Sequence, residues 1–278
     1  MSRALADMGT DVLPDAGCAF IGLAEVENAN VLKDLTAQPP LKARNMQFCH
    51  IEGPDKRGID CALLYNPALF TVKNVKLVPY VQELAKDSAF YTRGFLTVRG
   101  EMAGDDVAVI VCHWPSQFSG SFYRESGARQ TKAVKDSLLR LNPEMKVFVM
   151  GDMNDDPTSK SMYEVLRAQP EISEVGEGDM YNPWYNILAK EEKGTLYYRG
   201  KWNLFDQIVL TPNLLNKDGK KKGYRSLKYW NHQVFRRDYL IQQEGRYQGA
   251  PLRTKAGGKW LNGYSDHLPV VLYLVKKK

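Results

Sequence analysis

The chain has 278 residues, 44% of them hydrophobic, and a formal net charge of +6 with a pI near 9.0. This size allows one large domain or two small ones around a substantial core, and no apolar run is long enough to span a membrane as a helix. The positive charge is compatible with a polyanionic partner, although a solvated surface of lysines would produce the same excess.

The cysteines and the N-terminus bear on the cellular compartment. Cys18, Cys49, Cys61 and Cys112 are widely spaced and form no CxxC pair, which argues against a structural zinc site and a disulfide framework. Buried thiols in a reducing compartment are the simplest explanation and favour the cytoplasm. The first residues lack the basic and apolar regions of a signal peptide, but the chain looks incomplete at its start, where a signal could have been lost.

Apolar segments predict buried strands, and polar residues follow where these strands end. Residues 18–24 (CAFIGLA) end at Glu25, and a period of two places Glu25 and Glu27 on one face. A carboxylate there can bind a metal or simply be a solvated residue of the rim. Residues 107–112 (VAVIVC) end at His113, for which an ordinary core histidine is the alternative. Further strands are predicted at 61–65, 75–81 and 91–102, and a helix at 124–141.

The segment 146–157 (KVFVMGDMNDDP) is the most informative part of the chain. Its apolar run predicts a strand buried on both faces, which ends at Gly151 and is followed at once by Asp152 and Asn154. Asp156 and Pro157 have the character of an N-cap and a first helical residue, so we expect a helix that extends through Leu166. The alternative is a strand-to-helix loop in which Asp152 and Asn154 only cap turns.

Two later segments complete the pattern. Residues 202–210 (WNLFDQIVL) are apolar except for Asp206 and Gln207, and an aspartate within a buried strand is costly unless it is paired. The last predicted strand, residues 267–275, begins with His267 directly after Asp266. Between them, residues 217–225, which contain Lys220, Lys221 and Lys222, predict an exposed loop, and residues 235–259 predict a long loop beside the site. Without a repeat or a linker, we expect a single domain over residues 1–278.

Polar residues at strand ends can meet at one edge of a mixed sheet, because late and early ends of oppositely running strands lie together there. Such an edge would collect carboxylates, an amide and two imidazoles. Carboxylate oxygens bind Mg²⁺ or Ca²⁺, and an aspartate–histidine pair can activate water, so the pattern favours phosphoryl chemistry. Zinc is disfavoured because neither HExxH nor CxxC spacing occurs.

Six segments in order resemble the endonuclease/exonuclease/phosphatase superfamily, in its deoxyribonuclease and sphingomyelinase branch. They cover nearly the whole chain from residue 20 to residue 274 and fall in family order. The segments are IGLAEVEN (21–28), RGIDCALLY (57–65), VCHWPS (111–116), GDMND (151–155), FDQIVL (205–210) and SDHLPV (265–270). The resemblance implies a four-layer α/β sandwich, in which two packed mixed β-sheets are flanked by helices.

The resemblance also implies roles for the residues that bind metal and activate water. Glu25 looks like the metal-binding glutamate and Asp266 like a further metal contact, with Mg²⁺ as the implied ion and Mn²⁺ or Ca²⁺ as alternatives. His267 looks like the base that activates water, oriented by Asp206.

Three further residues match positions that contact the substrate in the family. Asp152 and Asn154 look like the pair that positions water and the phosphoryl oxygens. His113 resembles the phosphate-contacting or acid histidine of the deoxyribonuclease and sphingomyelinase branches. Whether Asp152 or His267 takes the proton from water stays open at this point.

One departure from the family concerns its first strand, which ends in a metal-contacting asparagine upstream of the glutamate strand. Nothing before Cys18 has the character of such a strand, and Asn28 and Asn30 lie after Glu25. We therefore expect this strand to be missing, the neighbouring strands to expose backbone groups and apolar side chains, and the metal to lose one oxygen ligand.

Three functions are consistent with these features. The first is a Mg²⁺-dependent phosphodiesterase acting on nucleic acid, in which Trp114 and the basic, Tyr-containing segment 220–237 contact phosphates and stack on bases. The second is a phosphatase or phosphodiesterase for a small or lipid-borne phosphate. The third is a non-catalytic, phosphate-binding relic. No protein partner is implied.

Overall fold

The computed structural model describes residues 1–83, 90–191, 193–217 and 224–277. The longer helices are α1 (Ser2–Asp7), α2 (Ala29–Thr36), α3 (Pro39–Lys42), α4 (Ser121–Leu141) and α5 (Tyr185–Glu191). The strands are β1 (Phe20–Val26), β2 (Gln47–His50), β3 (Asp60–Tyr65), β4 (Phe70–Val78), β5 (Phe95–Met102), β6 (Asp105–His113), β7 (Lys146–Asp152), β8 (Ala168–Gln169), β9 (Met180–Tyr181), β10 (Leu196–Tyr198), β11 (Lys201–Asn203), β12 (Asp206–Leu210), β13 (Lys228–Val234), β14 (Lys255–Ala256), β15 (Lys259–Trp260) and β16 (Val270–Val275). None of the described helices is long and apolar enough to cross a membrane.

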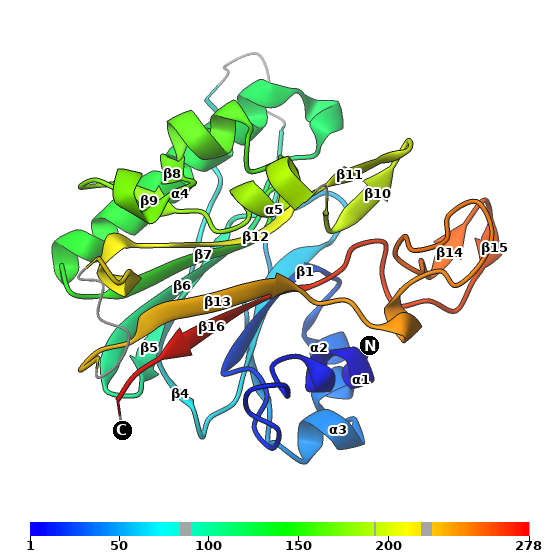
Figure 1. Cartoon of the computed structure of the whole chain (residues 1–278), viewed down its shortest axis with the longest axis horizontal. Coiled ribbons are helices and arrows are strands. Elements are labelled where there is room, and N and C mark those ends of the chain that lie inside the picture. The colour runs from blue at the N-terminus through cyan, green and yellow to red at the C-terminus, as the bar shows by residue number, and fades with distance from the viewer. Residues whose placement is uncertain (84–89, 192, 218–223, 278) are drawn as a thin grey trace.

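A seven-stranded mixed sheet is the largest element of the fold, with strand order β4-β5-β6-β7-β12-β9-β8 (Figure 1). Its central strands β6 and β7 run parallel, whereas β12 pairs antiparallel with β7. A second layer consists of the three-stranded sheet β1-β3-β2 and the two-stranded sheet β13-β16. Helix α4 covers one side of the large sheet, and α1, α2 and α3 lie beyond the second layer (Figure 1). The α/β class and four layers expected from the sequence are confirmed.

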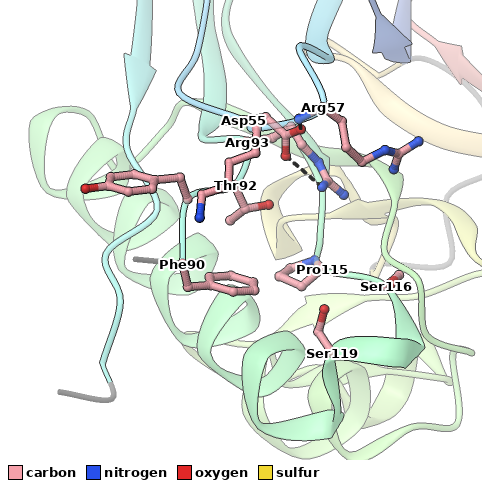
Figure 2. Close-up of a pocket in the computed structure, with 10 residues that line it drawn as sticks. Asp55, Arg57, Phe90, Thr92, Arg93, Pro115, Ser116 and Ser119 are labelled. Atoms are coloured by element: carbon pink, nitrogen blue, oxygen red, sulfur yellow. Dashed lines mark hydrogen bonds and ion pairs between the residues drawn. The ribbon is translucent and has the colours of Figure 1, made fainter. Parts of the chain in front are cut away.

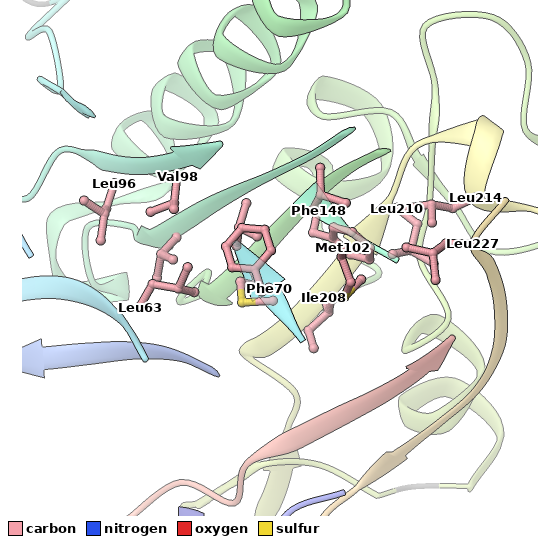
Figure 3. Packing of buried hydrophobic residues seen from close by; sticks show 14 of the residues in the cluster. Leu63, Phe70, Leu96, Val98, Met102, Phe148, Ile208, Leu210, Leu214 and Leu227 are labelled. Carbon is pink, nitrogen blue, oxygen red and sulfur yellow. The ribbon is translucent and has the colours of Figure 1, made fainter. Parts of the chain in front are cut away.

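The burial of strand β6 on both faces explains why its sequence is apolar without alternation. Val109 and Val111 pack into the core between the two sheet layers, while Ala108 and Ile110 pack toward α4. Both faces of the strand are therefore buried, which removes the polar face that an exposed sheet would show. Figure 3 shows the core between the layers, where Phe70, Phe148 and Ile208 come from different strands.

The second layer is divided between β1 and β16. Within the described residues no strand pairs with both of them. The apolar side chains at this division are better covered than expected, because Leu5 and Met8 join the same buried cluster as Ile21 and Val271. Helix α1 and the residues after it therefore supply part of the packing that a strand would supply.

Two local expectations from the sequence are wrong, and a third concerns residues that the structure does not describe. The carboxylate of Asp156 does not cap a helix but accepts a hydrogen bond of 2.7 Å from the amide of Leu204. Instead of a helix from Pro157, a single π-helical turn occupies Ser161–Val165. The three lysines at 220–222 lie outside the described residues.

Two other expectations about the chain are confirmed. The segment 235–259 is mainly loop, with one short helical turn at Asp238–Leu240 and the start of the small β14-β15 hairpin. The four cysteines are free thiols, three of them buried.

Candidate active site

Three site residues predicted from separate segments lie in one row across the large sheet. His113 is the last residue of β6 and is the register partner of Asp152, the last residue of the parallel strand β7. Asp152 is in turn the register partner of Asp206, the first residue of the antiparallel strand β12. The late ends of β6 and β7 and the early end of β12 thus share one edge, as we predicted.

His267 joins this row from the second layer. Its Nδ1 atom lies 2.7 Å from Oδ2 of Asp206, within the range of a strong hydrogen bond. The segment before β16 is held in place because the amide of Leu268 donates to the carbonyl of Thr195 at 2.8 Å. Burial by itself would lower the pKa of His267, but the negative charge and hydrogen bond of Asp206 raise it to about 10. In the protein without metal, His267 is an imidazolium at neutral pH.

Asp152 has an unusual acidity for a carboxylic acid. Burial and the neighbouring charge of Asp206 raise its pKa to about 7, although His267, the amide of Asn154 and Arg93 act in the opposite direction. The amide of Asn154 donates to Oδ1 of Asp152 at 2.8 Å. A carboxyl group with a pKa near neutrality can both accept and release a proton under ordinary conditions.

Asn154 is fixed by its backbone and its side chain. Its φ of 50° lies in the left-handed region, which asparagine tolerates better than most residues. Its Nδ2 atom donates to the carbonyl oxygen of Trp114 at 2.9 Å. The asparagine therefore ties the loop after β7 to the segment after β6, and the two segments hold their relative position.

His113 is the third ionisable group of the edge and is almost completely buried. Its Nε2 atom lies 3.6 Å from Oδ2 of Asp152. Burial, together with the positive charges of Arg93, Arg57 and His267, moves the pKa of His113 well below its usual value. The imidazole is therefore neutral, suited to donating a hydrogen bond rather than carrying a positive charge.

Gly151 allows Asp152 to occupy its place. Its φ is +132°, and a Cβ atom added there would lie 1.9 Å from the carbonyl oxygen of Cys112 on the neighbouring strand. No side chain fits in that space, so glycine is required at the residue before Asp152 in this row.

Buried polar contacts hold the loop beneath the row. The guanidinium of Arg124 on α4 forms an ion pair of 2.9 Å with Asp155, which also accepts a hydrogen bond of 2.6 Å from Ser161. Gln207 is fully buried, and its Nε2 atom donates to the carbonyls of Asp155 and Leu204. The two polar residues of β12 therefore have different roles. Asp206 contacts His267, and Gln207 supports the loop after β7.

Glu25, the predicted metal ligand, is less enclosed than the residues of the row. Its φ is 58°, and the register between β1 and β3 shifts between Leu23 and Val26, so it lies in a β-bulge. Glu25 and Glu27 are nevertheless both exposed, while Val26 between them is buried. The side chain is 56% exposed, and its Oε1 atom forms an ion pair of 2.9 Å with Arg57.

Asp266, the second predicted metal contact, is also exposed. Its Oδ2 atom is 3.9 Å from a guanidinium nitrogen of Arg253. Among the described residues, no three histidine, cysteine, aspartate or glutamate side chains form a group that could hold a metal ion. Hard carboxylate oxygens nevertheless fit Mg²⁺, which commonly takes one or two protein carboxylates and completes its shell with water and substrate phosphate.

Trp114 does not have the role expected from the sequence. It is among the largest fully buried side chains, and its Nε1 atom donates to Oγ1 of Thr131 on α4 at 3.2 Å. A ring that packs between sheet and helix cannot stack on the bases of a nucleic acid. Its carbonyl oxygen, in contrast, contacts the site through Asn154.

Arg93 is a buried polar residue beside the site that none of the six sequence segments contains. This guanidinium is almost fully buried, forms an ion pair of 3.0 Å with Asp55 and donates to the carbonyl of Trp114 at 3.0 Å. A cavity lies beside it, lined also by Arg57, Phe90 and Ser116 (Figure 2). A signal existed in the run YTRGF before β5, where one arginine precedes a strongly apolar strand, but its partner Asp55 lies 38 positions away.

A four-layer α/β sandwich with ionisable groups at one edge of its central sheet fits the class of phosphoester hydrolases. The chain belongs to the endonuclease/exonuclease/phosphatase family, whose model matches residues 1–276. The resemblance noted in the sequence is thereby confirmed. A comparison with curated protein sequences finds no match.

Solved structures with the same fold come from several branches. TDP2 of D. rerio complexed with a single-strand DNA product has a TM-score of 0.59 and 14% identity over 99% of this chain and 91% of its own. A mannosyl-6-phosphatase of Bacteroides thetaiotaomicron has the same TM-score and identity, with coverages of 98% and 91%. The human Nocturnin catalytic domain has a TM-score of 0.54 and 14% identity, with coverages of 92% and 81%.

Proposed function

We propose that this chain is a Mg²⁺-dependent phosphodiesterase that hydrolyses nucleic acid, with residues 1–278 acting as a single catalytic domain. The observation that carries the proposal is the 2.7 Å contact between His267 and Asp206 beside Asp152, whose pKa of about 7 suits proton transfer. Such a group is poised to handle the proton that a water molecule loses when it attacks phosphorus.

The pKa values of Asp152 and His267 favour different roles for these two groups in the reaction. Asp152 accepts the proton of the attacking water, because its pKa lies near neutrality. His267, kept positive by Asp206, faces the negative charge that develops on the phosphoryl oxygens. The side-chain carboxamide of Asn154 and the neutral imidazole of His113 then orient the substrate by hydrogen bonds.

Glu25 and Asp266 are the residues that would hold Mg²⁺. When bound, the ion would supply Lewis-acid stabilisation of the phosphoryl oxygens. Both side chains are exposed and now face guanidinium groups, so their oxygens are accessible to an ion from solvent.

Three observations support a nucleic acid as the substrate. The chain carries a net charge of +6, which favours a polyanion. Lys56, Arg57 and Arg93 gather at the cavity beside the row. A protein of the same fold, D. rerio TDP2, has been crystallised with a single-strand DNA product.

A phosphomonoesterase is the second candidate, favoured by the equal structural similarity of the mannosyl-6-phosphatase. Two assays in Mg²⁺ separate the candidates: nicking of a supercoiled plasmid, and release of inorganic phosphate from a panel of sugar, nucleotide and inositol monoesters. We expect nicking without phosphate release. Phosphate release without nicking would establish the second candidate, and silence in both assays from a folded protein would overturn both. The Asp152→Asn variant, purified in parallel, excludes a contaminating nuclease.

A further inference from the structure

The cavity beside the catalytic row has a volume of about 170 Å³. This is smaller than the 300–1,000 Å³ typical of pockets that enclose a whole ligand, so it suits one ring-sized part of a larger substrate. Figure 2 shows Asp55 and Arg93 at one side of the cavity, Phe90 and Pro115 at the other, and Thr92 between them.

The polar side of the cavity contains buried groups without partners. Arg93 and Thr92 are both more than nine-tenths buried. Nε of Arg93 and Oγ1 of Thr92 have no hydrogen-bond partner among the described residues, although the other guanidinium nitrogens of Arg93 contact Asp55 and Trp114. Leaving a buried donor unpaired costs free energy, so a small movement of Thr92 or Arg93 toward a ligand in the cavity would recover a hydrogen bond.

The opposite side is apolar and firmly held. The ring of Phe90 stacks on Tyr123 of α4 with a centroid distance of 4.5 Å and an interplanar angle of 29°. The backbone of Tyr123 is fixed within α4, and its carbonyl accepts a hydrogen bond of 3.1 Å from the hydroxyl of Tyr80. Phe90 and Pro115 thus present a preorganised apolar surface, against which a flat ring can lie without ordering a mobile side chain first.

The remaining features are positive charge at the cavity and its closeness to the catalytic row. Lys56 and Arg57 line the cavity, and the side chain of Arg57 is 61% exposed. The carbonyl oxygen of Trp114 accepts one hydrogen bond from Arg93 in the cavity and another from Asn154, which lies beside the row. One backbone group therefore separates the cavity from the site where we place the phosphoryl oxygens.

We propose that this cavity binds the nucleobase of the nucleotide adjacent to the scissile phosphate. The base lies against Phe90 and Pro115, directs its polar edge toward Thr92 and Arg93, and leaves its own phosphate near Lys56 and Arg57. A planar ring with a polar edge and an attached anion fits all three features of the cavity, which are its apolar surface, its unpaired polar groups and its positive charge. The inference rests on the proposed phosphodiesterase function and specifies how that site recognises its substrate.

A binding measurement without metal tests the cavity independently of catalysis. The probe is 2-aminopurine ribonucleoside monophosphate in EDTA, whose fluorescence is quenched when the base stacks. We expect Phe90→Ala to weaken binding by about tenfold or more, and Thr92→Val to weaken it less. The matched control is Phe118→Ala, which removes a 97% exposed ring from the neighbouring turn outside the cavity. Equal binding by wild type, Phe90→Ala and Thr92→Val, or no binding by wild type, would overturn the inference.

A kinetic measurement separates this inference from the proposed function. The substrates are the p-nitrophenyl ester of thymidine monophosphate and methyl p-nitrophenyl phosphate, a diester without a base. Phe90→Ala should lower kcat/KM for the thymidine ester by about tenfold, mainly through KM, and leave the methyl ester unchanged. Hydrolysis of both esters with equal sensitivity to Phe90→Ala and Thr92→Val refutes the base pocket alone. Hydrolysis of neither by the wild type refutes the phosphodiesterase, and the fluorescence titration then decides the cavity.

Discussion

The two halves of the candidate site differ in how completely the fold assembles them. His113, Asp152 and Asp206 are neighbours across one continuous sheet, and hydrogen bonds fix their surroundings. Glu25 and Asp266 come from the second layer, which is divided between β1 and β16, and both are exposed and face arginines. The acid–base half is therefore prepared in the protein alone, whereas Glu25 and Asp266, where we propose that Mg²⁺ binds, would have to exchange their present partners for the ion.

This difference has a physical origin in the environment of each half. Burial in the large sheet keeps water away, so that charges act strongly on each other and shift pKa values by several units. Exposed ion pairs such as Glu25–Arg57 contribute little to stability because water and salt screen them. A weak pair of this kind is easily exchanged for a divalent cation, which makes the looser half a suitable place for a metal.

The largest expected effect is on the prepared half. The His267→Ala variant should lower kcat for phosphodiester hydrolysis by about 10²–10⁴-fold, because the positive group opposite the phosphoryl oxygens is lost. His232→Gln is the matched control, a half-buried histidine of the same layer whose ring packs against Trp184. Circular dichroism should show that both variants fold. Wild-type turnover by a folded His267→Ala variant would remove His267 from the mechanism.

The next largest effect is a loss of stability when the space around Gly151, beside the row, is filled. Gly151→Ala should destabilise the protein by about 3 kcal/mol or more, because its Cβ would overlap the carbonyl of Cys112. Gly200→Ala is the control with a positive φ of +83° and no atom within 4 Å, for which about 1 kcal/mol is expected. Urea unfolding measures both. Equal losses would show that the packing at the row is not the source of the constraint.

The charge pair between the layers should appear as a pH-dependent stability. The pKa of His267 is raised to about 10 from an ordinary value of 6.5, so the folded protein binds a proton that the unfolded chain releases between these pH values. The stabilisation is thus fully present below pH 6.5 and is lost as the pH rises through 10.

The Asp206→Asn variant tests this in metal-free protein. It should cost about 1.5–3 kcal/mol at pH 6 and clearly less at pH 10, measured by urea unfolding in EDTA. Asp34→Asn, which changes an exposed carboxylate, should show no such difference. A cost that grows with pH would contradict the assignment of a protonated His267.

The smallest effect concerns the exposed half. Glu25→Gln should weaken Mg²⁺ binding by about tenfold, since one anionic ligand becomes neutral. Glu27→Gln, a neighbouring exposed glutamate on the same strand end, should leave the affinity unchanged. Isothermal titration calorimetry measures both. Equal affinity of wild type and Glu25→Gln would show that the ion binds elsewhere.

Local sequence patterns were sufficient for the strands that carry the site, because a strand buried on both faces must be apolar along its whole length. The runs before His113 and Asp152 and the isolated Asp206 were recognisable for this reason. At Glu25 the same reasoning did not foresee the β-bulge in which this residue lies. It failed at Trp114, because an aromatic residue after a strand can turn either to solvent or to a helix.

The sequence by itself determined which residues stand at the strand ends, since hydrophobic periodicity is encoded within each short segment. Only the tertiary structure decided the register that aligns His113, Asp152 and Asp206, and the pairs Asp55–Arg93 and Glu25–Arg57 that join distant segments. Such contacts depend on the packing of whole layers, and no local pattern specifies which of several arginines meets a given carboxylate. The cavity between Arg57, Phe90 and Pro115 has the same origin, because three loops must meet before it exists.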